Sequence, residues 1–172
     1  MDEPKEVGMA GRITKSEQQL KGDPRHGDKV LSRFINSVMV DGKKSVATRV
    51  IYDALDKIQA RIDKDKRENM PEKAIDAFHQ AIDNVKPNVE VRSKRVGGAN
   101  YQVPMPVTQR RRQSLAFRWI ITAARAEKGK PMCERLAREL YDAANGEGKA
   151  VNVREQTHRM AEANKAFSHF AW

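Results

Sequence analysis

Eight arginine and lysine side chains lie in a stretch of 36 residues that contains no aspartate or glutamate. The stretch covers residues 91–126, and its basic residues are Arg92, Lys94, Arg95, Arg110, Arg111, Arg112, Arg118 and Arg125. The whole chain has 33 basic and 23 acidic side chains, a net charge of +10, so most of the excess lies in this stretch. Such a local excess repels itself in the free protein and indicates a surface that binds a polyanion.

Three of these residues, Arg110, Arg111 and Arg112, follow Thr108, a residue type that commonly begins a helix. Positive side chains at a helix N-terminus are opposed by the helix dipole, so they cost stability in the free protein. A phosphate at that end would be bonded by both the arginines and the free backbone N–H groups. We therefore expect a phosphate-binding helix N-terminus.

Residues that could support catalysis or bind a metal form no comparable pattern. The four histidines have no cysteine or second histidine at metal-ligand spacing, and Cys133 has no base that the sequence can nominate. Gly97-Gly98 lacks the Lys-Ser/Thr pair that completes a phosphate-binding loop. We therefore expect no enzyme, no metal, no cofactor and no small-molecule substrate.

The rest of the composition favours a cytoplasmic protein. No apolar run approaches the ~18 residues of a membrane span, and the first twelve residues are too acidic and polar for a secretory signal. A single cysteine fits a reducing compartment. We expect no membrane association.

Apolar periodicity predicts the elements that carry these side chains. Helical spacing occurs over residues 30–39, 44–62, 75–85, 115–124, 136–144 and 151–167, with Asp28 as N-cap of the first helix. We therefore expect a mainly α-helical fold, with six helices in a single domain covering residues 28–172. Residues 1–27 lack this periodicity and hold four glycines, so we expect a flexible N-terminal arm.

Between the third and fourth helices the period changes to two. Residues 89–105 alternate apolar and polar side chains around Gly97-Gly98, which predicts one projecting basic β-hairpin. Tyr101 could stack on a base, whereas Trp119 is favoured as a core residue. The aromatic C-terminal residues Phe167, Phe170 and Trp172 could either pack back on the domain or contact a partner.

Three long segments resemble the bacterial type of the small-subunit ribosomal protein seven family. They are the hairpin VEVRSKRVGGANYQVP at residues 89–104, the turn DGKKS at residues 41–45, and the segment REQTHRMAEANKAFSH at residues 154–169. They occur in the family's order on the expected elements, and the match covers roughly residues 23–172.

This resemblance implies a structural constituent of the small ribosomal subunit that binds rRNA as a primary binder. It implies that the protein nucleates assembly of the head, the 3′ major domain, near the mRNA exit region and exit-site tRNA, beside neighbouring head proteins. It assigns rRNA contacts to Lys43, Lys44, Arg110, Arg111, Arg112 and Arg118. It assigns Arg92, Lys94 and Arg95 to the RNA-facing hairpin near the exit-site tRNA.

The sequence departs from the family pattern at both ends. Asp2, Glu3 and Glu6 dilute an arm that is usually basic, and Phe170-Ala171-Trp172 replaces a more usual Tyr-Arg-Trp. Two other functions stay open from the residues alone. The first is a DNA-binding helical protein whose hairpin acts as a wing, and the second is an adaptor whose basic face docks an acidic protein. Without the resemblance, Lys43 and Lys44 fit a solvated loop equally well.

Overall fold

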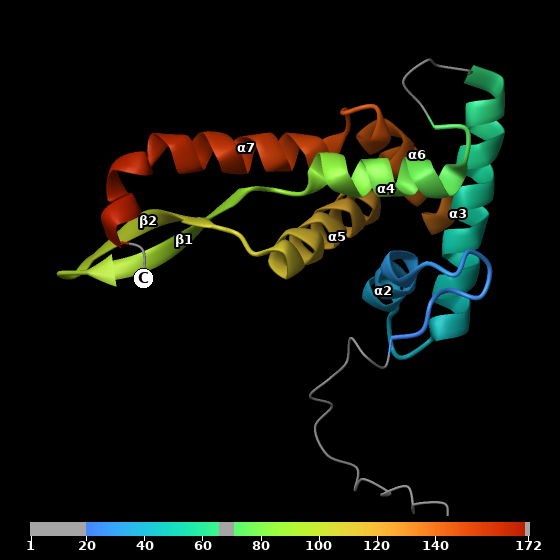
Figure 1. Ribbon diagram of the computed structural model, residues 1–172, viewed down its shortest axis with the longest axis horizontal. Helices are drawn as coiled ribbons and strands as arrows, with labels where there is room; N and C mark the ends of the chain where they lie inside the picture. Colours follow the sequence, from blue (N-terminus) through green and yellow to red (C-terminus); the bar gives the residue numbers. More distant parts are fainter. Residues whose placement is uncertain (1–19, 66–70, 171–172) are drawn as a thin grey trace, which may run out of the picture.

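The structure is a computed structural model that describes residues 20–65 and 71–170 (Figure 1). The strands β1 (Val89–Val96) and β2 (Ala99–Pro106) form an antiparallel hairpin between the third and fourth of the described α-helices. The described helices are α2 (Lys29–Val38), α3 (Lys44–Asp65), α4 (Ala74–Val85), α5 (Gln109–Ala126), α6 (Met132–Ala144), α7 (Lys149–Ala163) and the short 3-10 helix η1 (Lys165–Phe170). The predicted mainly helical fold with one hairpin is confirmed.

The core contains the apolar faces of α2 to α7. Phe34 of α2 is fully buried, and its ring packs edge-on against Phe78 of α4 and Phe117 of α5, with centroid distances of 5.3 and 5.2 Å. Edge-to-face contacts of this kind add to the stabilisation from burial. Trp119 is partly buried against the same core, as its position in the helical stripe predicts. The three phenylalanines fix α2 against α4 and α5.

Asp28 begins α2, as predicted, and also joins it to α4. Its carboxylate accepts hydrogen bonds from the backbone N–H groups of Val30 and Leu31 at 2.8 and 3.2 Å. The same carboxylate lies 2.8 Å from Nε2 of His79. One side chain therefore caps the helix and fixes its orientation.

Residues 20–27 form a turn that is bonded to α3. Asp23 is buried, and its carboxylate accepts hydrogen bonds from the backbone N–H of Arg25 and from the hydroxyl of Tyr52 on α3, at 3.0 and 2.7 Å. The remainder of the predicted arm, residues 1–19, lies outside the described residues, so its flexibility stays a prediction.

The hairpin closes through a two-residue turn. Val96 pairs with Ala99, and the intervening Gly97 and Gly98 have φ values of 56° and 89°. Positive φ at both central positions is the geometry that matches the twist of the strands, and glycine adopts it without strain. The hairpin ends at residue 106, one residue beyond the predicted end. β1, β2 and α7 extend together away from the other helices (Figure 1).

The last predicted helix is shorter than its periodicity suggested. It ends at Ala163, and η1 then turns the chain back onto the hairpin. The ring of Tyr101 on β2 lies 5.1 Å from that of Phe167 and 5.4 Å from that of Phe170. These aromatic contacts join segments far apart in sequence, so helical periodicity could not show them. Two of the three C-terminal aromatics thus pack on the domain, while Trp172 lies outside the described residues.

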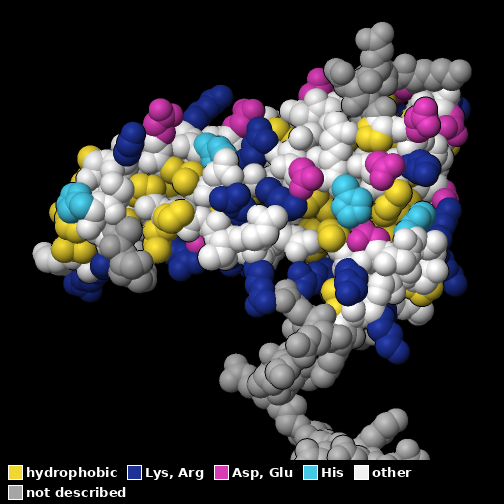
Figure 2. Space-filling model, in the orientation of Figure 1, with side chains coloured by type: hydrophobic (Ala, Val, Ile, Leu, Met, Phe, Trp, Pro, Cys, Tyr) yellow, Lys and Arg dark blue, Asp and Glu magenta, His cyan; other side chains and the backbone are white. Residues whose placement is uncertain are grey.

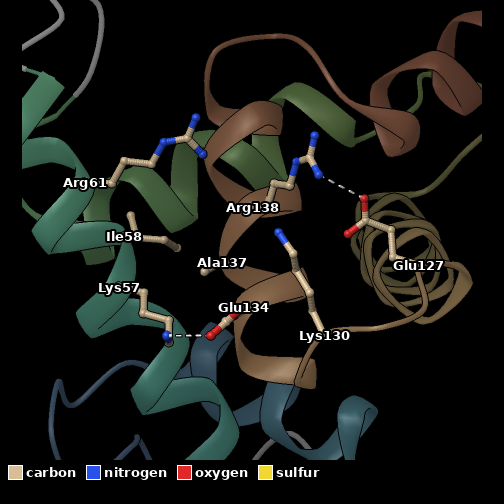
Figure 3. Close-up of a pocket in the computed structure, with 8 residues that line it drawn as sticks. All are labelled: Lys57, Ile58, Arg61, Glu127, Lys130, Glu134, Ala137 and Arg138. Atoms are coloured by element: carbon tan, nitrogen blue, oxygen red, sulfur yellow. Dashed lines mark hydrogen bonds and ion pairs between the residues drawn. The ribbon is translucent and has the colours of Figure 1, made fainter.

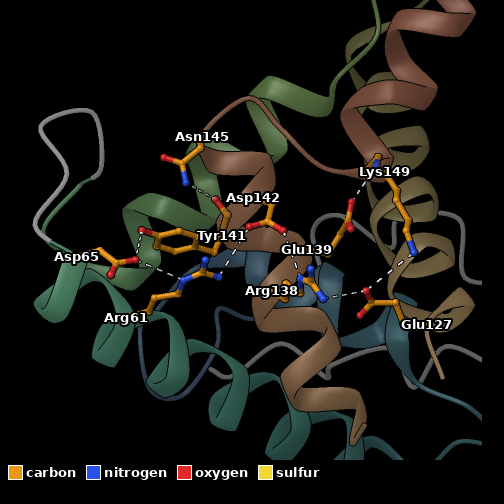
Figure 4. Close-up of polar contacts among 10 residues, drawn as sticks. Arg61, Asp65, Glu127, Arg138, Glu139, Tyr141, Asp142, Asn145 and Lys149 are labelled. Carbon is orange, nitrogen blue, oxygen red and sulfur yellow. Dashed lines mark hydrogen bonds and ion pairs between the residues drawn. The ribbon is translucent and has the colours of Figure 1, made fainter. Parts of the chain in front are cut away.

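A buried carboxyl group on α6 caps α7. Glu139 is 8% exposed, and its Oε1 accepts a hydrogen bond of 2.8 Å from the backbone N–H of Ala150 in the first turn of α7. The N-cap of α7 is Gly148, which has no side chain to do this. Burial raises the pKa of Glu139, although the N–H of Ala150 opposes the rise. Figure 4 shows this group beside the ion pairs of Arg138 with Glu127 and Asp142.

Candidate nucleic-acid interface

The start of α5 presents positive charge on a helix end whose backbone donors are not capped. Thr108 is the N-cap, as predicted, but its side chain makes no capping hydrogen bond. The first turn has no acidic residue, and Arg110 is exposed there. Since the first N–H groups of a helix have no partner within it, this end can bind a phosphate through backbone and side chains together.

Glu90 changes the interpretation of the acid-free stretch. Its carboxylate is nearly buried, and it forms ion pairs with both Arg92 of the hairpin and Arg111 of α5, the latter at 3.1 Å. Although the stretch itself has no acid, these two arginines are partly neutralised, because the acid that borders the stretch in sequence folds against both of them. The cluster is therefore partly balanced inside the protein, and it fixes the hairpin to α5.

The other two α5 arginines lie differently. Nε of Arg112 donates a 3.0 Å hydrogen bond to the carbonyl oxygen of Val107, so the backbone orients its guanidinium. Arg118 is exposed two turns after Arg110, roughly 12 Å further along the helix axis. Arg110, Ser114 and Arg118 are all exposed at a spacing of four residues, so they share one face of α5.

A shallow groove joins this helix end to α2. It has a volume of about 360 Å³ and is lined by Arg33, Asn36, Ser37, Arg110, Gln113, Ser114 and Phe117. A guanidinium nitrogen of Arg33 donates to Oε1 of Gln113 at 3.2 Å, which holds the two helices together across the groove. Arg33 and Arg110 therefore lie on opposite walls of one hollow.

Lys44 lies on the other side of α2. It lines a second groove of about 560 Å³, together with Asn36, Ile35 and the turn at residues 20–24. Asn36 lines both grooves, so Lys44 and Arg110, separated by 66 positions in sequence, flank the same helix. Lys43 is exposed in the turn between α2 and α3. The fold thus brings the two predicted rRNA-binding clusters to adjacent surfaces.

Asn36 and Gln113 were not among the predicted site residues. Both fall at polar positions of amphipathic helices, where a neutral amide side chain is expected whether or not it binds RNA. Their groove positions depend on the contact between α2 and α5, which local sequence does not reveal. Amide side chains are well suited to bond the edges of unpaired bases.

The three basic hairpin residues differ in their surroundings. Arg95 is exposed next to the turn, and Arg92 pairs with Glu90. Nζ of Lys94 donates a 2.8 Å hydrogen bond to the carbonyl oxygen of Phe170 in η1. Tyr101, considered as a base-stacking residue, is engaged by Phe167 and Phe170 instead. The hairpin is therefore supported by the C-terminal segment.

The lower edge of the visible face is mainly basic. Figure 2 shows Lys and Arg side chains along this edge, from the hairpin to the region of α2 and α3, with few Asp or Glu side chains among them, whereas both signs are mixed in the upper part of the view. This distribution is typical of a protein that binds a polyanion along one side.

A charged hollow between α3 and α6 has carboxylates among its cations, unlike the groove between α2 and α5. It is lined by Lys57, Arg61, Lys130 and Arg138 but also by Glu127 and Glu134 (Figure 3). Glu134 pairs with Lys57 at 3.2 Å, and Glu127 pairs with Arg138 at 3.4 Å. Exposed pairs of this kind contribute little energy, and they reduce the attraction for an anion.

Within the described ranges, no group of three or more His, Cys, Asp or Glu side chains could hold a metal ion.

His158 accepts a 3.2 Å hydrogen bond from the backbone N–H of Asn88, and burial, with a smaller effect of Arg154, lowers its pKa. It therefore reads as a neutral structural histidine. Of the helices in the described residues, none is long and apolar enough to span a membrane.

Comparison with known proteins shows which family the chain matches. The family model for ribosomal protein S7p/S5e matches residues 10–165. The chain is 54% identical over 164 residues, 95% of its length, to small ribosomal subunit protein uS7A/uS7B of Cereibacter sphaeroides, all of which is covered. It is 56% identical over 162 residues, 94% of its length, to small ribosomal subunit protein uS7 of Rhodopirellula baltica, 99% of which is covered.

The match confirms the resemblance, including its bacterial type. A third relative, small ribosomal subunit protein uS7 of Paracoccus denitrificans, is 52% identical over 95% of this chain and 100% of its own. The chain therefore belongs to the ribosomal protein S7p/S5e family, and it is a ribosomal protein of the small subunit rather than an enzyme.

Proposed function

We propose that this protein binds small-subunit rRNA as a primary binder and nucleates assembly of the head, the 3′ major domain of that RNA. In the assembled particle it lies near the mRNA exit region and the exit-site tRNA, in contact with neighbouring head proteins. Its place is the ribosome of a bacterial cytoplasm. Family membership supports the ribosomal part of this proposal.

The observation that carries the RNA-binding part is the arrangement around α2. Arg110 at the uncapped start of α5 and Lys44 at the start of α3 lie on either side of this helix and share Asn36 as a groove neighbour. A folded RNA places phosphates at many angles, so it can meet two separated cationic clusters at once. We assign rRNA contacts to Lys43, Lys44, Arg110, Arg111, Arg112 and Arg118.

The hairpin is the second contact region of the proposal. Arg92, Lys94 and Arg95 face RNA near the exit-site tRNA, and Arg95 is exposed close to the turn. The hydrogen bond between Lys94 and Phe170 and the stacking of Tyr101 limit the motion of the hairpin. A hairpin that is already ordered loses less entropy when it binds.

The mechanism is binding, in which phosphate contacts supply affinity and the shape of the RNA supplies specificity. If about eight cations engage phosphates, affinity should fall by roughly three to five orders of magnitude between ~50 and ~200 mM salt, on the scale known for DNA. A filter-binding titration with a transcript of the 3′ major domain tests this. Preference for duplex DNA would instead support the alternative of a DNA-binding protein with a hairpin wing.

A further inference from the structure

An apolar groove beside Lys43 has no role in the function proposed above. It lies between the end of α2, the start of α3 and the junction of α5 with α6, and its volume is about 340 Å³. Val40 and Val46 are each 56% exposed, the highest values among the large apolar side chains of the described residues. The apolar lining consists of Val38, Val40, Val46, Ala47, Val50 and Met132.

The charged residues that line this groove are all cations, namely Lys43, Arg125 and Arg135. A guanidinium nitrogen of Arg125 donates to the carbonyl oxygen of Val38 at 3.2 Å, and Arg135 donates to the carbonyl oxygens of Arg125 and Glu127. In the part of the chain that the structure describes, none of the three cations has a carboxylate partner. Backbone carbonyls thus hold both arginines in place without cancelling their charge.

Arg135 also has an unmet hydrogen bond. Its Nε is buried and has no acceptor among the described residues. Because protein atoms enclose this Nε, it is a local cost to stability and not a donor that a ligand in the groove can use. What the groove offers a ligand is an apolar floor and a fixed positive rim.

This combination matches the two faces of a nucleotide. An unstacked base offers an apolar surface with acceptors at its edge, and its phosphate carries the negative charge. An acidic peptide with an aliphatic anchor is the competing occupant. The nucleotide is favoured because Lys43 belongs both to the groove and to the proposed rRNA-binding set, so the groove continues that surface.

We propose that this groove binds an unpaired nucleotide of the same rRNA, with its base against Val40 and Val46 and its phosphate against Lys43, Arg125 and Arg135. The proposal rests on the proposed function and adds a base-contacting subsite to it. Its apolar part contributes affinity that depends on an unpaired base, whereas the helix-end cations act on phosphates of any sequence.

The test compares Val40→Ser/Val46→Ser with wild-type protein on a transcript of the 3′ major domain. We expect an affinity about tenfold lower, because apolar contact with the base is lost. The salt slope should not change, since no charge is removed. Base-specific chemical probing should show one short unpaired stretch that wild-type protein protects and the variant does not. Val153→Ser on α7, also a partly exposed valine, is the matched control and should bind like wild type.

A second measurement needs no variant. Ultraviolet cross-linking of the wild-type complex, followed by mass spectrometry, should attach a nucleotide to a peptide from residues 38–50 or 125–135. Unchanged affinity and protection in the double variant, with no cross-link in these peptides, would overturn the groove proposal while the proposed function stands. Failure of wild-type protein to bind the transcript would overturn both.

Discussion

Nε of Arg111 lies 3.1 Å from Oε2 of Glu90, and this contact joins the start of α5 to the first strand of the hairpin. The other carboxylate oxygen pairs with Arg92, so one nearly buried acid holds two of the predicted RNA-binding arginines. Both arginine side chains are nevertheless partly exposed, 47% for Arg92 and 38% for Arg111. Glu90 therefore sets the angle at which hairpin and helix meet a partner.

Replacing Glu90 by Gln should distinguish its effect on net charge from its effect on the position of the hairpin relative to α5. The free energy of unfolding should fall by about 1–2 kcal/mol, because the nearly buried carboxylate no longer pairs with the two partly exposed arginines. Affinity for duplex DNA should rise with the added positive charge. Affinity for rRNA should rise less, because the hairpin is no longer fixed to α5. Urea unfolding and competition binding measure the two effects.

The control for this substitution is Glu155→Gln, which makes the same change of charge on the exposed surface of α7. It should leave stability within about 0.5 kcal/mol and should keep the preference for rRNA. Equal loss of preference in both variants would mean that Glu90 acts through net charge alone.

Lys44 and Arg110 should act together on one RNA. The double variant Lys44→Gln/Arg110→Gln removes one cation from each side of α2, and we expect rRNA affinity to fall about 10- to 100-fold with a salt slope lower by about two. Lys57→Gln/Arg159→Gln removes the same charge from surfaces outside the proposed interface and should change affinity far less. A salt-dependent filter-binding series compares them, and equal losses would contradict the assignment of this surface.

The C-terminal aromatics should control the order of the hairpin. Phe167→Ala/Phe170→Ala removes both rings that contact Tyr101, which costs about 1–3 kcal/mol locally. Amide hydrogen exchange in residues 92–102 should accelerate at least tenfold, while exchange in α4 and α6 stays slow. Met160→Ala, an exposed residue on α7, is the control. Unaltered exchange in the hairpin would show that it is ordered without the C-terminal segment.

Glu139 should make stability depend on pH. Burial raises its pKa in the folded protein, so the folded state binds a proton more tightly than the unfolded state does. Stability should therefore fall as pH rises from the ordinary carboxyl value of about 4.5 through the raised one. Glu139→Gln keeps an oxygen for the N–H of Ala150 and should flatten this part of the curve, as thermal unfolding across pH would show.

Asp142 also contributes to the pH dependence of stability, so the Glu139→Gln variant should lose only part of it. Its pKa is raised in the same direction, by burial first, so part of the slope should remain in the Glu139→Gln variant. Glu139→Ala should be less stable at every pH by about 1–3 kcal/mol, because the first turn of α7 loses its acceptor. Identical pH profiles for wild-type and Gln proteins would contradict the assignment.

Local sequence was sufficient for the elements whose cause is local. Asp28 caps α2, the alternation around Gly97-Gly98 gives the hairpin, and Pro87 falls after α4 ends. Each depends on residues within a few positions, where propensity and turn geometry act. Of the three segments that carry the family resemblance, residues 89–104 form the hairpin, residues 41–45 cover the turn before α3 and its first two residues, and residues 154–169 lie on α7 and η1.

Contacts between distant segments were beyond local patterns. Glu90 marked only the border of the acid-free stretch, yet its partner Arg111 lies 21 positions away. The end of α7 was placed too late because the partner of Phe167 is Tyr101, 66 positions earlier. Asn36 joins two grooves only because α2 packs between α3 and α5. Each of these contacts joins segments far apart in sequence, so the apolar periodicity of a single helix or strand does not predict it.

The most direct test of rRNA binding uses the purified protein, a transcript of the 3′ major domain and competing duplex DNA across a salt series. The account predicts tight binding that prefers the transcript and weakens steeply with salt, with a slope that Lys44→Gln/Arg110→Gln reduces. Equal affinity for the transcript and duplex DNA, or a slope that this variant leaves unchanged, would contradict it.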